Sequence, residues 1–465
     1  MFEFLKNREK VLENIVKYTV ATIMLAIPLY PKFPFLKVPG TFVSIRLEDL
    51  LIFFAGILVF LTIIKSRKDF FKDGLNRAVI LFLASGFISV VSATLVTQTV
   101  VPHIAFLHWI RRAEYFIPLF LGIYSVRSQK GNLDFYFKVL VIAIIVAFLY
   151  GFGQRYLSWP VIITQNQEYS KGVALRWVPG SHINSTFAGH YDLATFLVLI
   201  LPTIIVSFFL LRGFLSKSLL AITLFCGLWL LVNSASRISL VSYLVASSLS
   251  LYFVKKYKEI IFIAVISIAF VGFSSNLLDR YQRLFEVGIQ KVQKLKIIRN
   301  YLSVDEAIAE EEDDFFKRKD VDFTPTPTPV FEDRSTNIRL NVEWPRAIRA
   351  FSKNPLLGTG YSSITLATDN DYLRLLGEVG LLGFLCFMLI FLRVFMIFLK
   401  AYPFHKKFSL LELAFVSGTF GSLPGLFINA FFIDIFEASK FAIIFFLILG
   451  LAIGLVFQRI ENEKT

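Results

Sequence analysis

Arginines, paired glycines and carboxylates follow one another between residues 339 and 384, where the sequence reads RLNVEWPRAIRAFSKNPLLGTGYSSITLATDNDYLRLLGEVGLLGF. After Arg339, the stretch NVEWPRAIRAF at 341–351 predicts a short amphipathic helix, which an Asn-Pro pair ends. Gly358 and Gly360 then permit positive φ and a close approach of the backbone to a ligand. Because arginine is permanently charged and offers a planar fork of donors, this region is suited to binding phosphate oxygens.

Two carboxylates stand just before the next predicted helix. Asp369 and Asp371 flank Asn370, and an aspartate with its usual pKa near 3.9 is ionised at neutral pH and able to accept a proton. A carboxylate at this place can equally cap the helix, and the residues alone leave both roles open. Further along, Asp371, Arg374 and Glu378 are spaced as one helical face, which predicts a salt-bridged row.

Most of the chain must lie in a membrane, because its composition leaves too little polar surface for a soluble protein of this size. Of the 465 residues, 56% are hydrophobic and only 18% are charged, whereas soluble domains have about 25% charged residues. The net charge of +14 would suggest nucleic-acid binding in a soluble protein. Here the basic residues form short clusters between apolar runs, which is typical of membrane topology, so we expect no nucleic-acid partner.

Apolar runs long enough to cross a bilayer, about 20 residues each, predict an all-α polytopic membrane protein with about twelve transmembrane helices. The predicted spans are 12–30, 49–65, 78–97, 104–125, 138–154, 191–211, 218–235, 238–254, 259–277, 378–399, 408–430 and 437–457. Lys and Arg gather in the even-numbered connections and the C-terminal tail, whereas the odd-numbered connections 98–103 and 431–436 have none. Both termini are therefore predicted to be cytoplasmic.

The chain is thereby divided into residues 1–277 with spans one to nine, a long extracytoplasmic loop at 278–377, and residues 378–465 with spans ten to twelve and a tail. A shorter outward loop covers about 155–191. Within the long loop, a linker at 304–330 contains alternating Thr and Pro, which favours an extended chain. It precedes the motif region at 339–377, where we expect the chemistry.

Charged residues interrupt the fourth span, in which Arg111, Arg112 and Glu114 occur together. Ionisable residues inside the membrane are rare and pair with one another or mark a functional contact. We interpret them as an ion pair that fixes helix packing, with a contact to a lipid-linked anionic substrate as the alternative.

In order and spacing these elements resemble the O-antigen ligase and O-antigen polymerase family. Its members carry an Arg-x-x-x-x-Trp element, a Pro-x-x-Gly-x-Gly turn, and a His-Asn or Asp-Asn pair leading into Leu-x-x-x-x-Glu-x-Gly-x-x-Gly. The matching residues are Arg339, Trp344, Pro355, Gly358, Gly360, Asp369, Asn370, Leu373, Glu378, Gly380 and Gly383. Upstream, SASRISLVSYL with Arg237, and STFAGHYDLATFLVLILP with His190 and Asp192, look like two further family elements.

The resemblance implies transfer of a glycan from undecaprenyl diphosphate to a hydroxyl of a glycan or lipid acceptor, without metal or cofactor. It places the reaction at the outer face of a bacterial inner membrane. Arg339 and Arg237 would hold the diphosphate leaving group, and Asp369 would activate the acceptor, so these three are the expected catalytic residues. The residues expected to bind substrate are Arg176, His190, Asp192, Trp344, Gly358, Gly360, Asn370, Arg374 and Glu378.

One departure from the family pattern bears on the reaction. Ligases that this chain resembles carry a histidine where Asp369 stands, and polymerase-like members often show Asp-Asn, so a polymerase is favoured over a ligase. An exporter or flippase of lipid-linked oligosaccharide remains the alternative from a different class, since it would share the span count and basic loops. A Walker loop, a Rossmann fingerprint and an HExxH motif are all missing from the sequence.

The orientation can be tested by labelling single cysteines in intact cells, starting from a variant in which Cys226 and Cys386 are replaced. A cysteine at Thr326, in the predicted outward loop, should react with a membrane-impermeant thiol reagent, and one at Lys256 should not. Labelling at Lys256 without labelling at Thr326 would reverse the predicted orientation.

Overall fold

The computed structural model describes residues 2–31, 34–37, 44–65, 67–128, 132–162, 174–274, 337–364 and 367–463. The predicted linker at 304–330 and most of the long loop lie outside these residues. Each predicted span corresponds to one helix among the described residues. These helices are α1 (Phe2–Leu29), α2 (Leu47–Lys65), α4 (Gly74–Leu95), α5 (Pro102–Ser128), α6 (Asn132–Tyr156), α7 (His190–Leu210), α8 (Phe214–Asn233), α9 (Arg237–Phe253), α10 (Tyr257–Val271), α14 (Asp371–Ala401), α15 (Leu410–Ala430) and α16 (Ser439–Asn462).

Within the described part of the chain, nine helices are long and apolar enough to cross a membrane. Three fall short of that standard: α5 carries the charged residues noted above, and α9 and α10 have 17 and 15 residues. The all-α prediction is confirmed, and the number of spans stays a prediction.

Short elements join the long helices: α3 (Arg67–Lys72), a π-helical turn η3 (Arg339–Glu343), α13 (Trp344–Lys353), a 3₁₀ turn η4 (Phe404–Lys406), and two antiparallel strand pairs, β1 (Pro34–Lys37) with β2 (Ser44–Arg46) and β3 (Val161–Ile162) with β4 (Ala174–Leu175).

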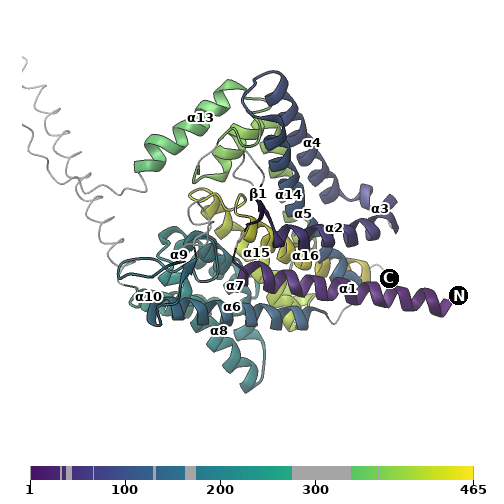
Figure 1. Ribbon diagram of the computed structural model, residues 1–465. Coiled ribbons are helices and arrows are strands. Elements are labelled where there is room, and N and C mark those ends of the chain that lie inside the picture. The colour runs from purple at the N-terminus through teal and green to yellow at the C-terminus, as the bar shows by residue number, and fades with distance from the viewer. Residues whose placement is uncertain are drawn as a thin grey trace, which may run out of the picture.

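The helices run back and forth between two ends of the bundle. At one end, the loop before α7 meets the last residues of α1 and α8: the Thr186 hydroxyl donates to the Pro28 carbonyl at 2.7 Å, and the Ile183 N–H to the Asn233 carbonyl at 3.0 Å. We call this the site end. The two chain termini lie on the side away from α10 and α13 (Figure 1), where Lys407 pairs with Glu463 at 3.1 Å.

Small residues allow the central helices to approach closely. On α15, Gly421 lies against Ser250 of α9 and Gly418 against Thr203 of α7, so closely that an added Cβ would overlap either neighbour. On α16, Gly450 lies in the same way against the Leu119 carbonyl of α5. Such small-residue contacts are typical of helix association in membranes, where van der Waals packing replaces the hydrophobic effect.

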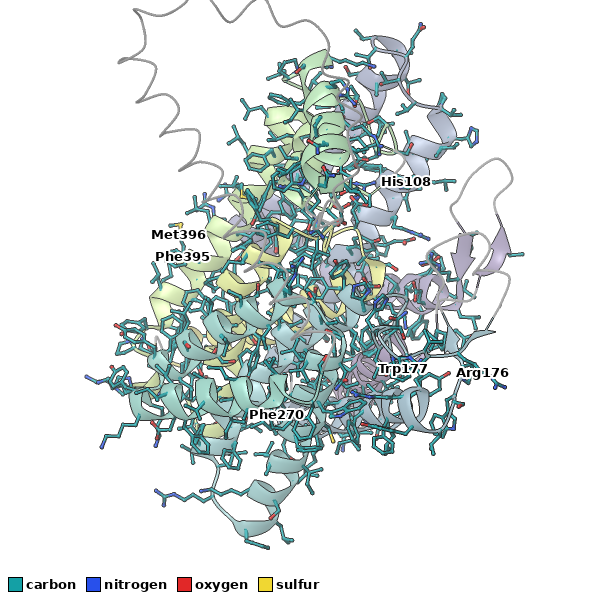
Figure 2. All side chains as sticks on the ribbon, turned by 90° about the vertical axis from the view of Figure 1, so that its left-hand side faces the viewer. His108, Arg176, Trp177, Phe270, Phe395 and Met396 are labelled. Carbon is teal, nitrogen blue, oxygen red and sulfur yellow. The ribbon has the colours of Figure 1, made fainter. Side chains whose placement is uncertain are left out.

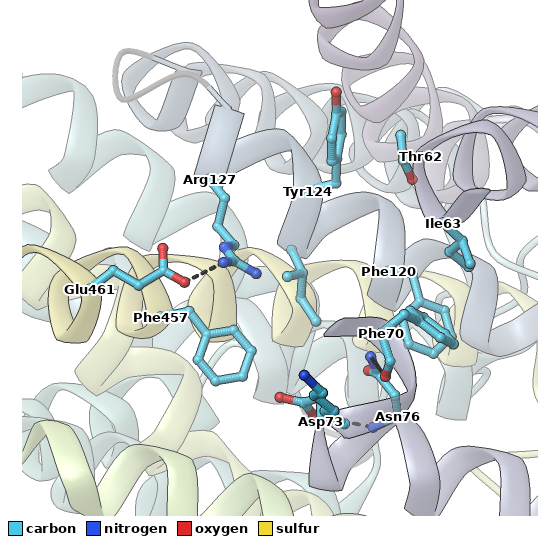
Figure 3. A pocket seen from close by; sticks show the side chains of 12 residues that line it. Thr62, Ile63, Phe70, Asp73, Asn76, Phe120, Tyr124, Arg127, Phe457 and Glu461 are labelled. Atoms are coloured by element: carbon cyan, nitrogen blue, oxygen red, sulfur yellow. Dashed lines mark hydrogen bonds and ion pairs between the residues drawn. The ribbon is translucent and has the colours of Figure 1, made fainter. Parts of the chain in front are cut away.

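The outer surface of the bundle is apolar, as a lipid-facing surface requires. Phe395 and Met396 project from α14 at the edge of the molecule (Figure 2) and are 46% and 41% exposed. A cavity of about 620 Å³ opens between α2, α3, α5 and α16 (Figure 3). The ion pair of Arg127 with Glu461 stands at its rim, which places the cavity at the end opposite the motif residues.

A break in α14 joins the motif region to the bundle. Gly380 has φ 66° and ψ −172°, so the helix is interrupted there and resumes with a new first turn. The interruption leaves backbone groups without helical partners, and the 355–360 turn satisfies them. The Thr359 and Gly360 N–H groups donate to the carbonyls of Gly377 and Glu378 at 2.9 and 2.8 Å.

Hydrogen bonds also run from the N–H groups of the resumed helix to the carbonyls of the turn. The N–H groups of Leu381 and Leu382, which open the resumed helix, donate to the carbonyls of Pro355 and Leu356 at 2.8 and 3.1 Å. Since buried backbone groups need partners, the turn and the broken helix depend on each other. The predicted end of the short helix at the Asn-Pro pair is confirmed, because α13 ends at Lys353.

Replacing Gly380 by alanine should destabilise the protein. Its backbone conformation is almost exclusive to glycine, at a cost of about 1–3 kcal/mol for other residues, and the new Cβ would overlap the Leu356 carbonyl oxygen. Thermal unfolding of the detergent-purified protein measures the effect. Gly56→Ala is the matched control, since only the flexible end of Ile117 lies near its Cβ position; equal melting temperatures for both variants would contradict the interpretation.

Candidate active site

The motif region brings an arginine and an aspartate into direct contact. Arg339 in η3 donates from Nε and Nη2 to the same oxygen, Oδ2 of Asp369, at 3.0 and 2.7 Å. Both side chains are largely buried, with 11% and 24% of their surface exposed. Two of the three residues expected to be catalytic therefore form one ion pair at the site end of the bundle.

Asp434 holds the backbone on both sides of Asp369. Its carboxylate accepts the N–H of Thr368 at 2.8 Å and the N–H of Asn370 at 2.9 Å. Asp369 between them has φ 50°, a left-handed conformation that aspartate tolerates better than most residues. Sequence reasoning missed Asp434, although a carboxylate in the short apolar connection after α15 was a usable signal.

The residues that follow Asp369 stabilise the start of α14. Asn370 caps the helix by accepting the Leu373 N–H at 3.0 Å. The idea that an aspartate caps this helix is wrong, because the neighbouring amide takes that place. Asp371 instead accepts the N–H groups of Ile435 and Phe436 at 2.7 and 3.2 Å, which ties α14 to the connection between α15 and α16.

A network of charges completes this connection. Arg374 lies 3.1 Å from Asp434, 3.2 Å from Glu437 and 3.6 Å from Glu378, so part of the predicted salt-bridged row is present. Arg112 of α5 pairs with the same Glu437 and donates to the Phe436 carbonyl at 2.9 Å. The neighbouring Arg111 pairs with Asp49 at 3.0 Å. The interpretation of the α5 arginines as ion-pairing residues is thus confirmed.

The first residues of α7 lie beside the ion pair of Arg339 with Asp369. The Tyr191 hydroxyl accepts a hydrogen bond from Arg339 Nη2 at 3.5 Å. The rings of His190 and His182 lie 3.7 Å apart between centroids, and Asp192 is buried in the first turn of α7. His190 therefore adjoins a residue that contacts Arg339, while Tyr191 and His182 were not singled out from the sequence.

Lys440, at the start of α16, fixes the loop that leads into α7. This lysine is fully buried, and its ammonium group donates to the Thr186 carbonyl at 2.9 Å. It also lies over the ring of Phe187 at 5.3 Å. The Ser-Thr-Phe element is thereby anchored to the bundle.

The remaining predicted residues have different surroundings. Arg237 is the first residue of α9, after Ser236, whose hydroxyl caps the helix. Arg176 is exposed after β4 (Figure 2). Trp344 packs edge-on against Phe431 at 5.8 Å. Roles in catalysis or binding for these residues stay predictions.

Gly358 and Gly360 have positive φ values of 72° and 86°, which the absence of a side chain permits. Protein atoms surround them: an added Cβ would overlap the Glu378 carbonyl at Gly358, and the Ala93 side chain at Gly360. Their visible function is to let the turn approach α14, and their contact with substrate also stays a prediction.

Burial and charge set the acidity of the central pair in opposite directions. Burial raises the pKa of Asp369 above its ordinary value, and the nearby Asp434 adds to this, while Arg339 opposes it. Burial alone would lower the pKa of Arg339, but Asp369 and Tyr191 outweigh it, so the pKa lies above its usual value. Arg339 consequently stays charged. Among the described residues, His, Cys, Asp and Glu form no group of three placed to hold a metal ion.

Comparison with known families adds independent evidence. Residues 222–388 match the family model described as O-Antigen ligase. The matched segment runs from α8 into α14 and contains Arg237, Arg339 and Asp369. The resemblance seen in the sequence is confirmed over this segment. No curated protein matches the chain.

Removing the charge of Asp434 should destabilise the site end. Asp434→Asn removes one of the three carboxylates beside Arg374 and leaves one of the Thr368 and Asn370 N–H groups without its carboxylate acceptor, a change that typically costs about 1–3 kcal/mol. Unfolding in detergent measures the loss. Asp134→Asn is the matched control, because it breaks an exposed ion pair with Lys138 worth about 0.5 kcal/mol. Equal losses in the two variants would show that Asp434 is not a buried anchor.

Proposed function

From the O-antigen ligase segment at residues 222–388 in a multi-pass membrane protein, we propose that this chain transfers a glycan from undecaprenyl diphosphate to an acceptor hydroxyl. The acceptor is a second glycan or a lipid. The observation that carries the proposal is the buried pair of Arg339 with Asp369, which joins a permanent positive charge to a proton-accepting group at one end of the bundle.

The diphosphate gains negative charge as the glycosidic bond breaks, and preorganised positive groups stabilise such charge in a transition state. In our proposal Arg339 and Arg237 provide this stabilisation. A guanidinium has five N–H donors, so Arg339 can face Asp369 and phosphate oxygens together. Asp369 accepts a hydrogen bond from the acceptor hydroxyl. This contact orients the hydroxyl oxygen toward the anomeric carbon of the donor. The substrate contacts expected from the sequence complete the site.

The finer assignments rest on sequence. The basic clusters in the even-numbered connections support a site at the outer face of a bacterial inner membrane, with both termini in the cytoplasm. Asp369 followed by Asn370 supports a polymerase over a ligase, by resemblance. The metal-independent character of the reaction is likewise part of the proposal. The alternative of an exporter gains no support from the family match.

The test is transfer by the purified protein with an undecaprenyl-diphosphate-linked oligosaccharide as donor and acceptor. Longer lipid-linked glycans should form. Asp369→Asn should slow transfer by about 10² to 10⁴, the usual contribution of such a group, because the amide cannot accept the hydroxyl's proton. Binding of labelled donor, measured separately, should be retained.

Two further variants make the result specific. Arg339→Lys keeps the charge but loses the planar fork, so donor binding and transfer should both fall strongly. Arg127→Lys, at the opposite end of the bundle, should leave both unchanged. Transfer by Asp369→Asn at close to the parental rate would overturn its role and direct attention to His190 and Asp192. Movement of intact donor across vesicles without any longer product would favour export.

A further inference from the structure

Glu343 is a second carboxyl group beside the central pair, and nothing in the sequence motif singles it out. It closes η3, four residues after Arg339. Its side chain is half-buried, and within the described part of the chain its buried Oε2 atom has no hydrogen-bond partner. Buried polar atoms in proteins are normally bonded, so this oxygen is a group for which a partner is expected.

Other buried polar atoms in the same two segments share this property. Among the residues that the structure describes, Trp344 Nε1 and Arg346 Nη1 on α13, and Thr368 Oγ1 next to Asp369 in the chain, are buried and lack hydrogen-bond partners. The two segments are joined by the contact of Arg339 with Asp369. Each of these atoms is therefore also a group for which a partner is expected.

The charges near Glu343 come from both segments and from the connection after α15. Arg339 and Arg346 lie on its own side, Asp369 precedes α14, and Asp434 follows α15. Burial raises the pKa of Glu343 to about 7, and Asp369 and Asp434 add to this effect, while the two arginines oppose it. A carboxyl group of this acidity can both take up and release a proton near neutral pH.

Asp369 is less suited to keeping a proton. Both of its contacts with Arg339 involve the same oxygen at 2.7 and 3.0 Å, and these favour the ionised form. Glu343 has no such contact with a guanidinium among the described hydrogen bonds and ion pairs. Of the two carboxyl groups, the geometry ties Asp369 to Arg339 and leaves an oxygen of Glu343 available.

We propose that Glu343 is a further catalytic carboxyl group, which receives the proton that the acceptor hydroxyl loses during transfer. This inference rests on the proposed function. Asp369 accepts the hydrogen bond of the hydroxyl and takes up its proton. The acceptor oxygen forms a bond to the anomeric carbon as the bond from that carbon to the diphosphate oxygen breaks. The bonding electrons leave with the diphosphate, and the proton passes from Asp369 to the Glu343 carboxylate.

The proposal predicts a specific pH dependence. Because Glu343 must be ionised to receive a proton, the parental transfer rate should rise with pH and level off above about 7. Glu343→Gln should lower the plateau rate by about 10²-fold or more and abolish this rise, while donor binding is retained. Glu343→Asp should keep the rise at a reduced rate, since the carboxyl group is preserved. The measurement is the rate of glycan extension between pH 5 and 9.

Two further variants distinguish a catalytic role of Glu343 from a structural one. Glu463→Gln removes a carboxylate that pairs with Lys407 at the opposite end, and should leave rate and pH profile unchanged. Glu343→Ala should regain part of its activity when formate is added, because a small carboxylate can replace the missing group. A pH rise that persists in Glu343→Gln, or a variant rate equal to the parental rate, would overturn the proposal.

The outcome for Glu343 is distinguishable from that of the proposed function. If the parental protein forms no longer glycan at any pH, the proposed function fails. If the parental protein and Glu343→Gln extend glycan equally while Asp369→Asn does not, the function stands and only the role of Glu343 is wrong.

Discussion

The exchange of backbone hydrogen bonds between the 355–360 turn and the broken helix α14 is the constraint on which the site depends. An intact helix would satisfy its own backbone groups, and the turn would have nothing to bind. Because Gly380 interrupts α14, four hydrogen bonds join the two segments, with distances from 2.8 to 3.1 Å. Together with the contact of Ala347 on α13 against Gly377, they fix η3 and Arg339 relative to Asp369.

Ion pairs and charged hydrogen bonds fix the position of Asp369 relative to the connection between α15 and α16. Buried ion pairs contribute little net stability, since desolvation opposes their attraction, but they specify geometry when every partner is satisfied. Arg374 and Arg112 share Glu437, and Asp434 bonds the backbone around Asp369. In this way the connection between α15 and α16 positions a residue more than sixty positions earlier in the chain.

The proposed reaction uses the groups that these contacts hold in place. In our proposal Arg339 faces Asp369 and the diphosphate together, so donor binding and acceptor activation are coupled through one guanidinium. The start of α7, anchored by buried Lys440 and contacting Arg339 through Tyr191, joins the Ser-Thr-Phe element to this coupling. Glu343 adds a carboxyl group that is not held by Arg339.

The helices and the order of the motif residues could be predicted from the sequence, because membrane helices satisfy their backbone hydrogen bonds locally and are marked by apolar runs. The end of α13 could be predicted as well, and glycine at 358 and 360 permitted the positive φ values found there. Long-range contacts were needed to show that Asn370 rather than an aspartate caps α14, and that Asp434, Tyr191 and Glu343 lie near the central pair. These contacts join segments that are distant in the sequence or depend on which side of a turn a side chain faces. The spacing of residues along the chain contains no information on either feature.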